Sequence, residues 1–273
     1  RLGGLGILHR FMTVEENVRV YEEAMTHLDD LVYEVGVSIG VGDDEFRRAG
    51  ALYNAGARLF CVDIAHAHTK LMGKMIKKLR SCCGDLFIIA GNVATHAGAD
   101  FLVGVGAAAG KVGVGPGSVC TTREVSGHGV PQLTAIMDCA RINKPIIADG
   151  GMRTSGDIVK ALAAGATMVM LGGMLSGTDE ACGEPGTYRG MASVEAREDR
   201  GEAPGWRAAE GIAIDVAPKG PVSDVIRNIV EGLKSGLSYS GAKNLDELRR
   251  KAQFIQTTPA SFTEGKASKS GLG

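Results

Sequence analysis

The segment Gly113-Val-Gly-Pro-Gly-Ser-Val-Cys-Thr-Thr-Arg123 carries one thiol, Cys120, directly after a glycine-rich turn and before two hydroxyls and an arginine. Glycine permits positive φ angles and a close approach of the backbone to a ligand, and Pro116 restricts the turn, so the loop can hold main-chain groups and a sulfur in a fixed array. A lone cysteine is more often a small buried apolar residue. The flanking residues favour the other interpretation, a nucleophile in a reactive loop.

Two glycine pairs, Gly150-Gly151 and Gly172-Gly173, each follow an apolar run that is typical of a strand. Backbone N–H groups in such turns bind phosphate, although tight turns alone also require glycine. Asp149 precedes the first pair and could accept the hydroxyls of a ribose. The alternative is that Asp149 caps a helix that begins near Ser155.

The stretch Asp63-Ile-Ala-His-Ala-His68 offers His66 and His68 at alternate positions, which is one way to bind a metal. A third ligand in a matching context is not evident in the sequence. Contact with a cofactor, or a role in the loop itself, is therefore the preferred interpretation of the two histidines.

The composition excludes several classes of protein. Of 273 residues, 44% are hydrophobic and 22% charged, with a net charge of −1, which gives no electrostatic reason to expect nucleic acid or an anionic membrane as partner. We find no apolar run of about 18 residues and no secretory leader, and we expect a cytoplasmic protein. The six cysteines show no paired C-x-x-C spacing and are expected to be free thiols.

Short apolar runs alternate with longer amphipathic ones along most of the chain. The alternation predicts a parallel sheet with right-handed crossovers, either an open doubly wound sheet or a closed (β/α)8 TIM barrel. Polar or glycine clusters follow each strand, which favours the barrel, because a barrel collects all its strand ends at one active face. The predicted strands are Gly4–His9, Tyr33–Val41, Leu59–Ile64, Leu86–Asn92, Gly110–Val114, Pro145–Asp149 and Thr167–Leu171. The predicted helices are Val14–Leu28, Asp44–Ala55, Thr69–Arg80, Val130–Ala140, Ser155–Ala164 and Ser223–Ser235.

Only seven strands are predicted, so we expect a single barrel domain over residues 1–273 whose first βα unit precedes Arg1. Residues 176–220, hereafter the flap, are rich in Gly, Pro and charge. They predict a long mobile segment over the barrel mouth without regular structure. Residues 257–273 are expected to be a polar tail.

Five ordered motifs together resemble the family of inosine monophosphate dehydrogenases and guanosine monophosphate reductases, over nearly the whole chain. They are Gly113 to Arg123, Gly129-Val-Pro-Gln-Leu133, Ile146-Ile-Ala-Asp-Gly-Gly151, Met170-Leu-Gly-Gly-Met174 and Tyr188-Arg-Gly-Met191. The resemblance implies a (β/α)8 barrel, usually a homotetramer, that binds a purine nucleotide at the strand ends beside a nicotinamide cofactor, NADPH or NADH. It also implies that Cys120 attacks C2 of the purine to form a covalent intermediate.

The resemblance further implies roles for the surrounding residues. A monovalent cation, often potassium, would bind the carbonyls of Gly115, Gly117 and Cys120. The cofactor side would hold Asp63, Ile64, Ala65, Asn92 and Arg123. The nucleotide would contact Ser118, Asp149, Gly150, Gly151, Gly172, Gly173, Gly190, Met191, Arg207 and Gly211.

The flap distinguishes the two branches of the family. Dehydrogenases activate water with an Arg-Tyr pair, but in the matching stretch Asp199-Arg200-Gly201 glycine replaces the tyrosine. Trp206-Arg-Ala-Ala-Glu-Gly211 resembles the reductase pattern, in which Glu210 and Thr122 would protonate and expel ammonia. The favoured reaction is therefore GMP + NAD(P)H to IMP, ammonia and NAD(P)⁺, in purine salvage.

Other readings stay open. The opening Gly3-Gly-Leu-Gly-Ile-Leu-His9 and Ala192, where reductases usually have serine, are more like a dehydrogenase, which would convert IMP to XMP. A catalytically inactive barrel that only binds purine nucleotides is a second alternative. A metal-dependent hydrolase using His66 and His68 is a third.

Overall fold

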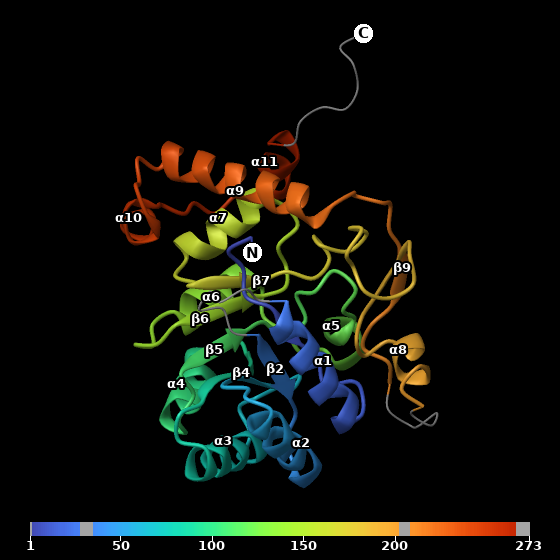
Figure 1. The fold of residues 1–273 in the computed structure, drawn as a ribbon. Helices are drawn as coiled ribbons and strands as arrows, with labels where there is room; N and C mark the ends of the chain where they lie inside the picture. Colours follow the sequence, from blue (N-terminus) through green and yellow to red (C-terminus); the bar gives the residue numbers. More distant parts are fainter. Residues whose placement is uncertain (1, 28–34, 202–207, 266–273) are drawn as a thin grey trace.

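The computed structural model describes residues 2–27, 35–201 and 208–265. Its centre is a curled sheet of seven parallel strands whose spatial order follows the chain, β1 to β7 (Figure 1). The strands are β1 (Ile7–Leu8), β2 (Gly36–Ile39), β3 (Leu59–Asp63), β4 (Phe87–Val93), β5 (Ala109–Val112), β6 (Ile146–Asp149) and β7 (Met168–Met170). The predicted parallel sheet is confirmed, and it resembles a TIM barrel that is open between β1 and β7.

Helices connect the strands and cover the outside of the sheet (Figure 1). Threonine side chains cap the N-termini of several of them, and Thr154 forms a reciprocal capping box with Asp157. The helices that alternate with strands are α1 (Val14–Thr26), α2 (Asp43–Asn54), α3 (Lys70–Cys82), α4 (His96–Gly104), α6 (Gln132–Cys139) and α7 (Ser155–Ala163). The helices α9 (Val222–Tyr239) and α10 (Leu245–Lys251) pack against α7.

Side chains alternate between the two faces of the sheet. One face packs against the helices in a large core that includes Phe60, Ile88 and Ile146. The inner face begins with an apolar layer of Cys61, Ile89, Ala109 and Ile147. Because successive side chains of a strand point to opposite faces, the next inward positions are Asp63, Gly91, Lys111 and Asp149. A polar layer therefore covers the apolar one at the carboxyl ends of the strands.

The structure corrects three sequence predictions. The flap contains regular structure in its described part: β8 (Thr187–Arg189) and β9 (Ala213–Asp215) form an antiparallel pair, and α8 (Val194–Glu198) lies between them in the chain. Figure 1 shows α8 near one end of β9. The predicted polar tail begins with α11 (Pro259–Glu264). The prediction also missed α4, α5 (Thr122–Ser126) and α10, because they are short, and in α4 two glycines weaken the amphipathic pattern.

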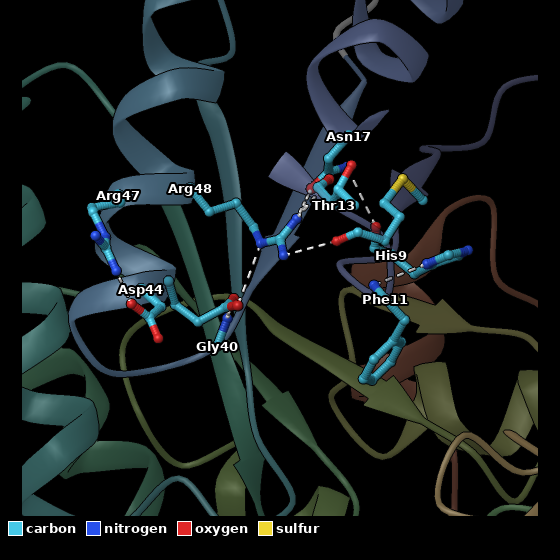
Figure 2. A network of polar contacts seen from close by, with 10 residues as sticks. His9, Phe11, Thr13, Asn17, Gly40, Asp44, Arg47 and Arg48 are labelled. Carbon is cyan, nitrogen blue, oxygen red and sulfur yellow. Dashed lines mark hydrogen bonds and ion pairs between the residues drawn. The ribbon is translucent and has the colours of Figure 1, made fainter. Parts of the chain in front are cut away.

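A buried arginine joins the segment after β1 to helix α2. Arg48 donates to the carbonyls of Met12 and Thr13 at 2.9 and 3.3 Å and to Oδ1 of Asn17 at 3.1 Å, and it forms an ion pair with Glu45 (Figure 2). Its exposed neighbour Arg47 pairs only with Asp44 in the same view. The network positions the loop that carries Arg10 and Phe11 toward the carboxyl ends of the strands.

Helix length and the cysteines give two further properties of the described residues. Among the described residues, the helices are all too short or too polar to cross a lipid bilayer. The six cysteines are all free thiols, and Cys61 and Cys139 are buried.

Candidate active site

A cavity of about 920 Å³ opens at the carboxyl ends of the strands, beneath the flap. Its floor is formed by the polar layer of the sheet, and its roof by residues of the loop after β1 and of the flap. The lining residues are Arg10, Phe11, Asp63, Ile64, Ala65, Asn92, Lys111, Asp149, Met191, Ala192, Arg197, Arg200, Ala208 and Glu210. Volumes of this size are typical of small-molecule and cofactor sites.

Cys120 lies beside this cavity, in a chain of hydrogen bonds that ends on a carboxylate. Its Sγ donates to Oγ1 of Thr122 at 3.2 Å, and the Thr122 hydroxyl donates to Oε2 of Glu210 at 2.7 Å. Glu210 lies 88 positions further along the chain. The arrangement can move a proton between sulfur and carboxylate through one hydroxyl.

Backbone pairing between the flap and the cysteine loop fixes the position of Glu210. Thr121 donates its amide to the carbonyl of Glu210 at 3.1 Å, and Ile212 donates to Val119 at 3.0 Å. Gly190 and Gly211 allow the flap to approach the cysteine loop, because a Cβ on them would lie 3.1 and 3.3 Å from the carbonyl oxygen of Val119. The side chain of Glu210 is thus held over Thr122 by the main chain on both sides.

Several of the predicted nucleotide residues come together around Ser118. A Cβ added to Gly173 would lie 2.7 Å from Oγ of Ser118, and one added to Gly150 would lie 3.1 Å from the amide nitrogen of Gly117. The loops after β5, β6 and β7 are therefore in close contact. Backbone and hydroxyl donors gather there, as they do in phosphate sites.

Tyr188 completes this group, although it was quoted above only as part of a motif. Its phenol forms a hydrogen bond with Ser118 and lies 2.9 Å from the position that a Cβ of Gly172 would occupy. Burial raises the pKa of the phenol above its usual value, and the nearby Asp149 acts in the same direction. Tyr188 therefore stays protonated and can donate a hydrogen bond to a ligand.

The floor of the cavity is a compact ionic cluster. Nζ of Lys111 lies 2.6 Å from Oδ2 of Asp149 and 2.9 Å from Oδ1 of Asp63. Asn92 accepts from Lys111 at 2.5 Å and donates to Asp149 at 2.9 Å. The pairing register of β4 shifts between Gly91 and Val93, which turns Asn92 toward the cavity.

Other predicted site residues lie elsewhere. Arg123 does not line the cavity; its stem packs between Gly115 and Gly129, and its guanidinium donates to the carbonyl of Val130 at 2.6 Å. Arg207 falls outside the described residues. Gly151 packs on Gln132, next to the cluster around Ser118.

In the described part of the structure, His66 and His68 do not belong to a group of three or more side chains that could bind a metal ion. The ring of His68 packs against Phe101, with 4.9 Å between the ring centroids. Among the described residues, no three His, Cys, Asp or Glu side chains are grouped so that they could hold a metal ion.

Besides Tyr188, sequence reasoning missed several residues that line the cavity, among them Lys111, Phe11 and Arg200. Lys111 occupies an inward position of β5, and a charged residue inside a predicted buried strand was the available signal. Phe11 and Arg200 are in contact, with the guanidinium carbon of Arg200 4.4 Å from the ring centroid. Nothing in the sequence pattern indicated the contact between Phe11 and Arg200, which joins the loop after β1 to the flap.

A parallel α/β sheet with a cysteine and glycine-rich turns at the carboxyl ends of its strands is typical of enzymes that bind phosphorylated small molecules. Comparison with known proteins makes this specific. The IMP dehydrogenase / GMP reductase domain model matches residues 1–268, and the chain belongs to that family, whose members are NAD(P)-dependent oxidoreductases.

Individual relatives carry both names. Inosine-5'-monophosphate dehydrogenase of Aquifex aeolicus is 46% identical over 249 residues, which cover 84% of this chain and 51% of the relative. GMP reductase of Leishmania donovani is 44% identical over 253 residues, which cover 84% and 51%. The chain thus spans about half the length of these relatives.

Solved structures show the same division. A crystal structure of a GMP reductase variant from Trypanosoma brucei, in complex with guanosine 5'-monophosphate, superimposes with a TM-score of 0.84 at 43% identity and covers 89% of this chain and 54% of that one. Inosine 5'-monophosphate dehydrogenase from Legionella pneumophila gives 0.82 at 48% identity and covers 94% and 81%. Sequence identity is slightly higher to the dehydrogenases than to the reductases. The choice between the two reactions therefore depends on the residues of the site.

Proposed function

We propose that the protein is a GMP reductase, which converts GMP and NAD(P)H to IMP, ammonia and NAD(P)⁺. The observation that carries the proposal is the hydrogen bond of 2.7 Å between Thr122 and Glu210, which connects the carboxylate to the nucleophile. Expulsion of ammonia requires a proton at the leaving nitrogen, and this pair can deliver it. The dehydrogenases of the family activate water with an Arg-Tyr pair, and here Arg200 is present but glycine, Gly201, stands in the position of the tyrosine.

The proposed first step is the attack of the Cys120 thiolate on C2 of the guanine ring. The S–C2 bond forms, and the thiol proton passes through Thr122 to Glu210. The C2–N2 bond then breaks, and Glu210 returns the proton through Thr122 to the departing amine, which leaves as ammonia. Dividing the displacement into two steps lowers the barrier of each.

The second step restores the enzyme. A reduced nicotinamide, when bound, supplies a hydride to C2. The S–C2 bond breaks as the purine becomes IMP, and Cys120 leaves as a thiolate. The residues of this chain that would hold the nicotinamide are Asp63, Ile64, Ala65 and Asn92, which line the cavity beside Cys120 and Glu210.

The nucleotide would bind across the loops after β5, β6 and β7. Asp149 would accept the ribose hydroxyls, while Ser118, Tyr188 and the two glycine pairs would bind the phosphate, together with Gly190, Met191, Arg207 and Gly211 of the flap. Arg123 would support the cysteine loop rather than contact the cofactor, since its guanidinium binds Val130. The carbonyls of Gly115, Gly117 and Cys120 would hold a monovalent cation such as potassium, as the family resemblance implies.

We also propose how the fold is completed. The open edges β1 and β7 border an apolar groove of about 710 Å³ whose lining includes Leu2, Ile158, Leu162, Val169 and Ile226. An additional βα unit seated there would bury this surface and close an eight-stranded barrel. The resulting catalytic domain would form a homotetramer, as the family resemblance implies, and its mass in solution tests that part.

The deciding experiment incubates the intact protein with GMP and NADPH, then with GMP and NADH, and follows absorbance of the reduced cofactor and release of ammonia. GMP-dependent oxidation with one ammonia per turnover supports the reductase. Reduction of NAD⁺ with IMP as substrate supports the dehydrogenase, which the identities to the Aquifex and Legionella proteins favour. Nucleotide binding without either reaction identifies an inactive barrel.

A further inference from the structure

We infer that Lys111 is a positioning residue that couples the purine-nucleotide site to the cofactor site through one buried ammonium group. The inference rests on the proposed function, which assigns Asp149 to the nucleotide and Asp63 to the cofactor. No role was predicted for Lys111 from the sequence.

The geometry sets Lys111 between the two carboxylates. Its side chain is only 4% exposed, and Nζ lies 2.6 Å from Asp149 on β6 and 2.9 Å from Asp63 on β3. Each carboxylate keeps some contact with the cavity, with 24% and 43% of its side chain exposed. A lysine buried under both of them cannot easily reach a ligand itself, but it fixes the direction of the oxygens that can.

The backbone is shaped to admit this lysine. A Cβ on Gly91 would lie 2.5 Å from Cβ of Lys111 and 2.6 Å from its carbonyl oxygen. Gly91 and Lys111 are register partners on β4 and β5, so only glycine leaves room for the lysine stem there. Asn92, the residue after Gly91, binds both Lys111 and Asp149 and extends the cluster across four neighbouring strands.

Electrostatics explains why a cation is needed at this point. Burial has the largest single effect and lowers the pKa of the Lys111 ammonium, but the neighbouring groups, chiefly Asp149 and Asp63, together outweigh it, so the pKa is raised above its ordinary value. The lysine is therefore charged at neutral pH. Without it, two carboxylates would face each other in a site closed by the apolar layer beneath.

The groups that face Lys111 from the neighbouring strands are acidic or neutral. The groups facing Lys111 are Asp63 and Cys61 from β3, Asn92 from β4 and Asp149 from β6. Burial raises the pKa of the Cys61 thiol to about 12, so this thiol is neutral. Glu210, Arg10, Arg197 and Arg200 line the same cavity at the flap and at the loop after β1.

The test uses Lys111→Met, which keeps the length of the side chain and removes the charge. Binding of GMP alone and of NADPH alone is measured by calorimetry, together with the two KM values. We expect both affinities to fall about tenfold or more, as when one partner of a buried charge cluster is removed. Asp149→Asn should weaken mainly the binding of GMP, and Asp63→Asn should weaken mainly the binding of NADPH.

A pH profile separates positioning from a purely structural role. In Lys111→Met, repulsion raises the pKa of one of the two carboxylates, so the acid limb of kcat/KM should move to higher pH by about one unit. Lys111→Arg retains the charge and should leave the acid limb in place, whatever its effect on packing. Lys234→Met removes an exposed lysine of α9 and should change none of these quantities.

The outcomes distinguish this inference from the proposed function. If the wild-type protein neither binds nor turns over GMP, the proposed function fails. If the wild-type protein is active and Lys111→Met folds with an unchanged acid limb, or weakens only one ligand, the coupling role of Lys111 is wrong. If Lys111→Met does not fold, the pH profile of Lys111→Arg decides the question. An acid limb of kcat/KM that moves by about one pH unit in Lys111→Arg, which keeps the charge, contradicts the inference.

Discussion

Thr122 and Glu210 are 88 positions apart in the chain, yet their side chains form a hydrogen bond of 2.7 Å beside the thiol of Cys120. The bond depends on backbone pairing between the flap and the cysteine loop, through Thr121 with Glu210 and Ile212 with Val119. The family relationship allows either of two reactions at such a cysteine. The relay from sulfur through hydroxyl to carboxylate is the feature that favours loss of ammonia.

The relay predicts a selective loss of turnover in Glu210→Gln. The amide cannot carry the proton to the leaving nitrogen, so kcat for GMP should fall by about 10²- to 10⁴-fold while the affinity for GMP changes little. Steady-state kinetics and calorimetry measure the two quantities. Glu231→Gln, on the exposed face of α9, is the matched control and should behave like wild type. Full activity of Glu210→Gln would remove the relay from the mechanism.

A second prediction concerns the glycine pair after β7. In Gly173→Ala the new Cβ would lie 2.7 Å from Oγ of Ser118, so the side chain of Ser118 must shift. We expect the affinity for GMP to fall about tenfold, which corresponds to about 1.4 kcal/mol. The control is Gly104→Ala at the end of α4, where a Cβ meets no atom within 4 Å. Equal affinities for the two variants would show that this pair is only a turn.

The arginine network after β1 predicts a large difference between two neighbouring residues of α2. Arg48→Met leaves Glu45 and Asn17 without their buried partner, and we expect a loss of about 3–5 kcal/mol in the free energy of unfolding. Arg47→Met removes only an exposed ion pair and should cost at most about 1 kcal/mol. Urea unfolding followed by circular dichroism measures both. Similar losses in the two variants would contradict the role given to Arg48.

The buried thiols predict a loss of stability at alkaline pH. Burial raises the pKa of Cys61 and of Cys139 from 9.0 to about 12. Between these values the unfolded chain releases thiol protons that the folded protein keeps, so the folded state binds more protons and its stability falls as pH rises. Below pH 9 the contribution is fully present.

The measurement is the urea midpoint from about pH 8 to about pH 11. Replacing both buried thiols with alanine should flatten the alkaline part of this profile, whatever it does to absolute stability. Cys82→Ala changes an exposed thiol and should leave the slope unchanged. An unaltered slope in the double variant would show that the two thiols do not cause the alkaline loss.

Much of the fold was predictable because it depends on local periodicity. Runs such as Leu59–Asp63 and Ile146–Asp149 are strands whose apolar residues face cores on both sides, and amphipathic segments such as Lys70–Cys82 are helices. The hairpin of β8 and β9 was missed because two three-residue strands carry little pattern of their own. Pairing across the flap stabilises them, and a sequence pattern does not report pairing.

The sequence alone pointed to Cys120 as the proposed nucleophile, and it predicted the glycine-rich loops and the alternation that brings strand ends to one edge, because these follow from residue type and nearest neighbours. Only the tertiary structure decided which distant groups meet: Glu210 on Thr122, Tyr188 on Ser118, and Lys111 between Asp63 and Asp149. Such contacts depend on the register of neighbouring strands and on the path of the flap. Both are set by packing and backbone pairing summed over the whole sheet, and no single segment of the chain encodes them.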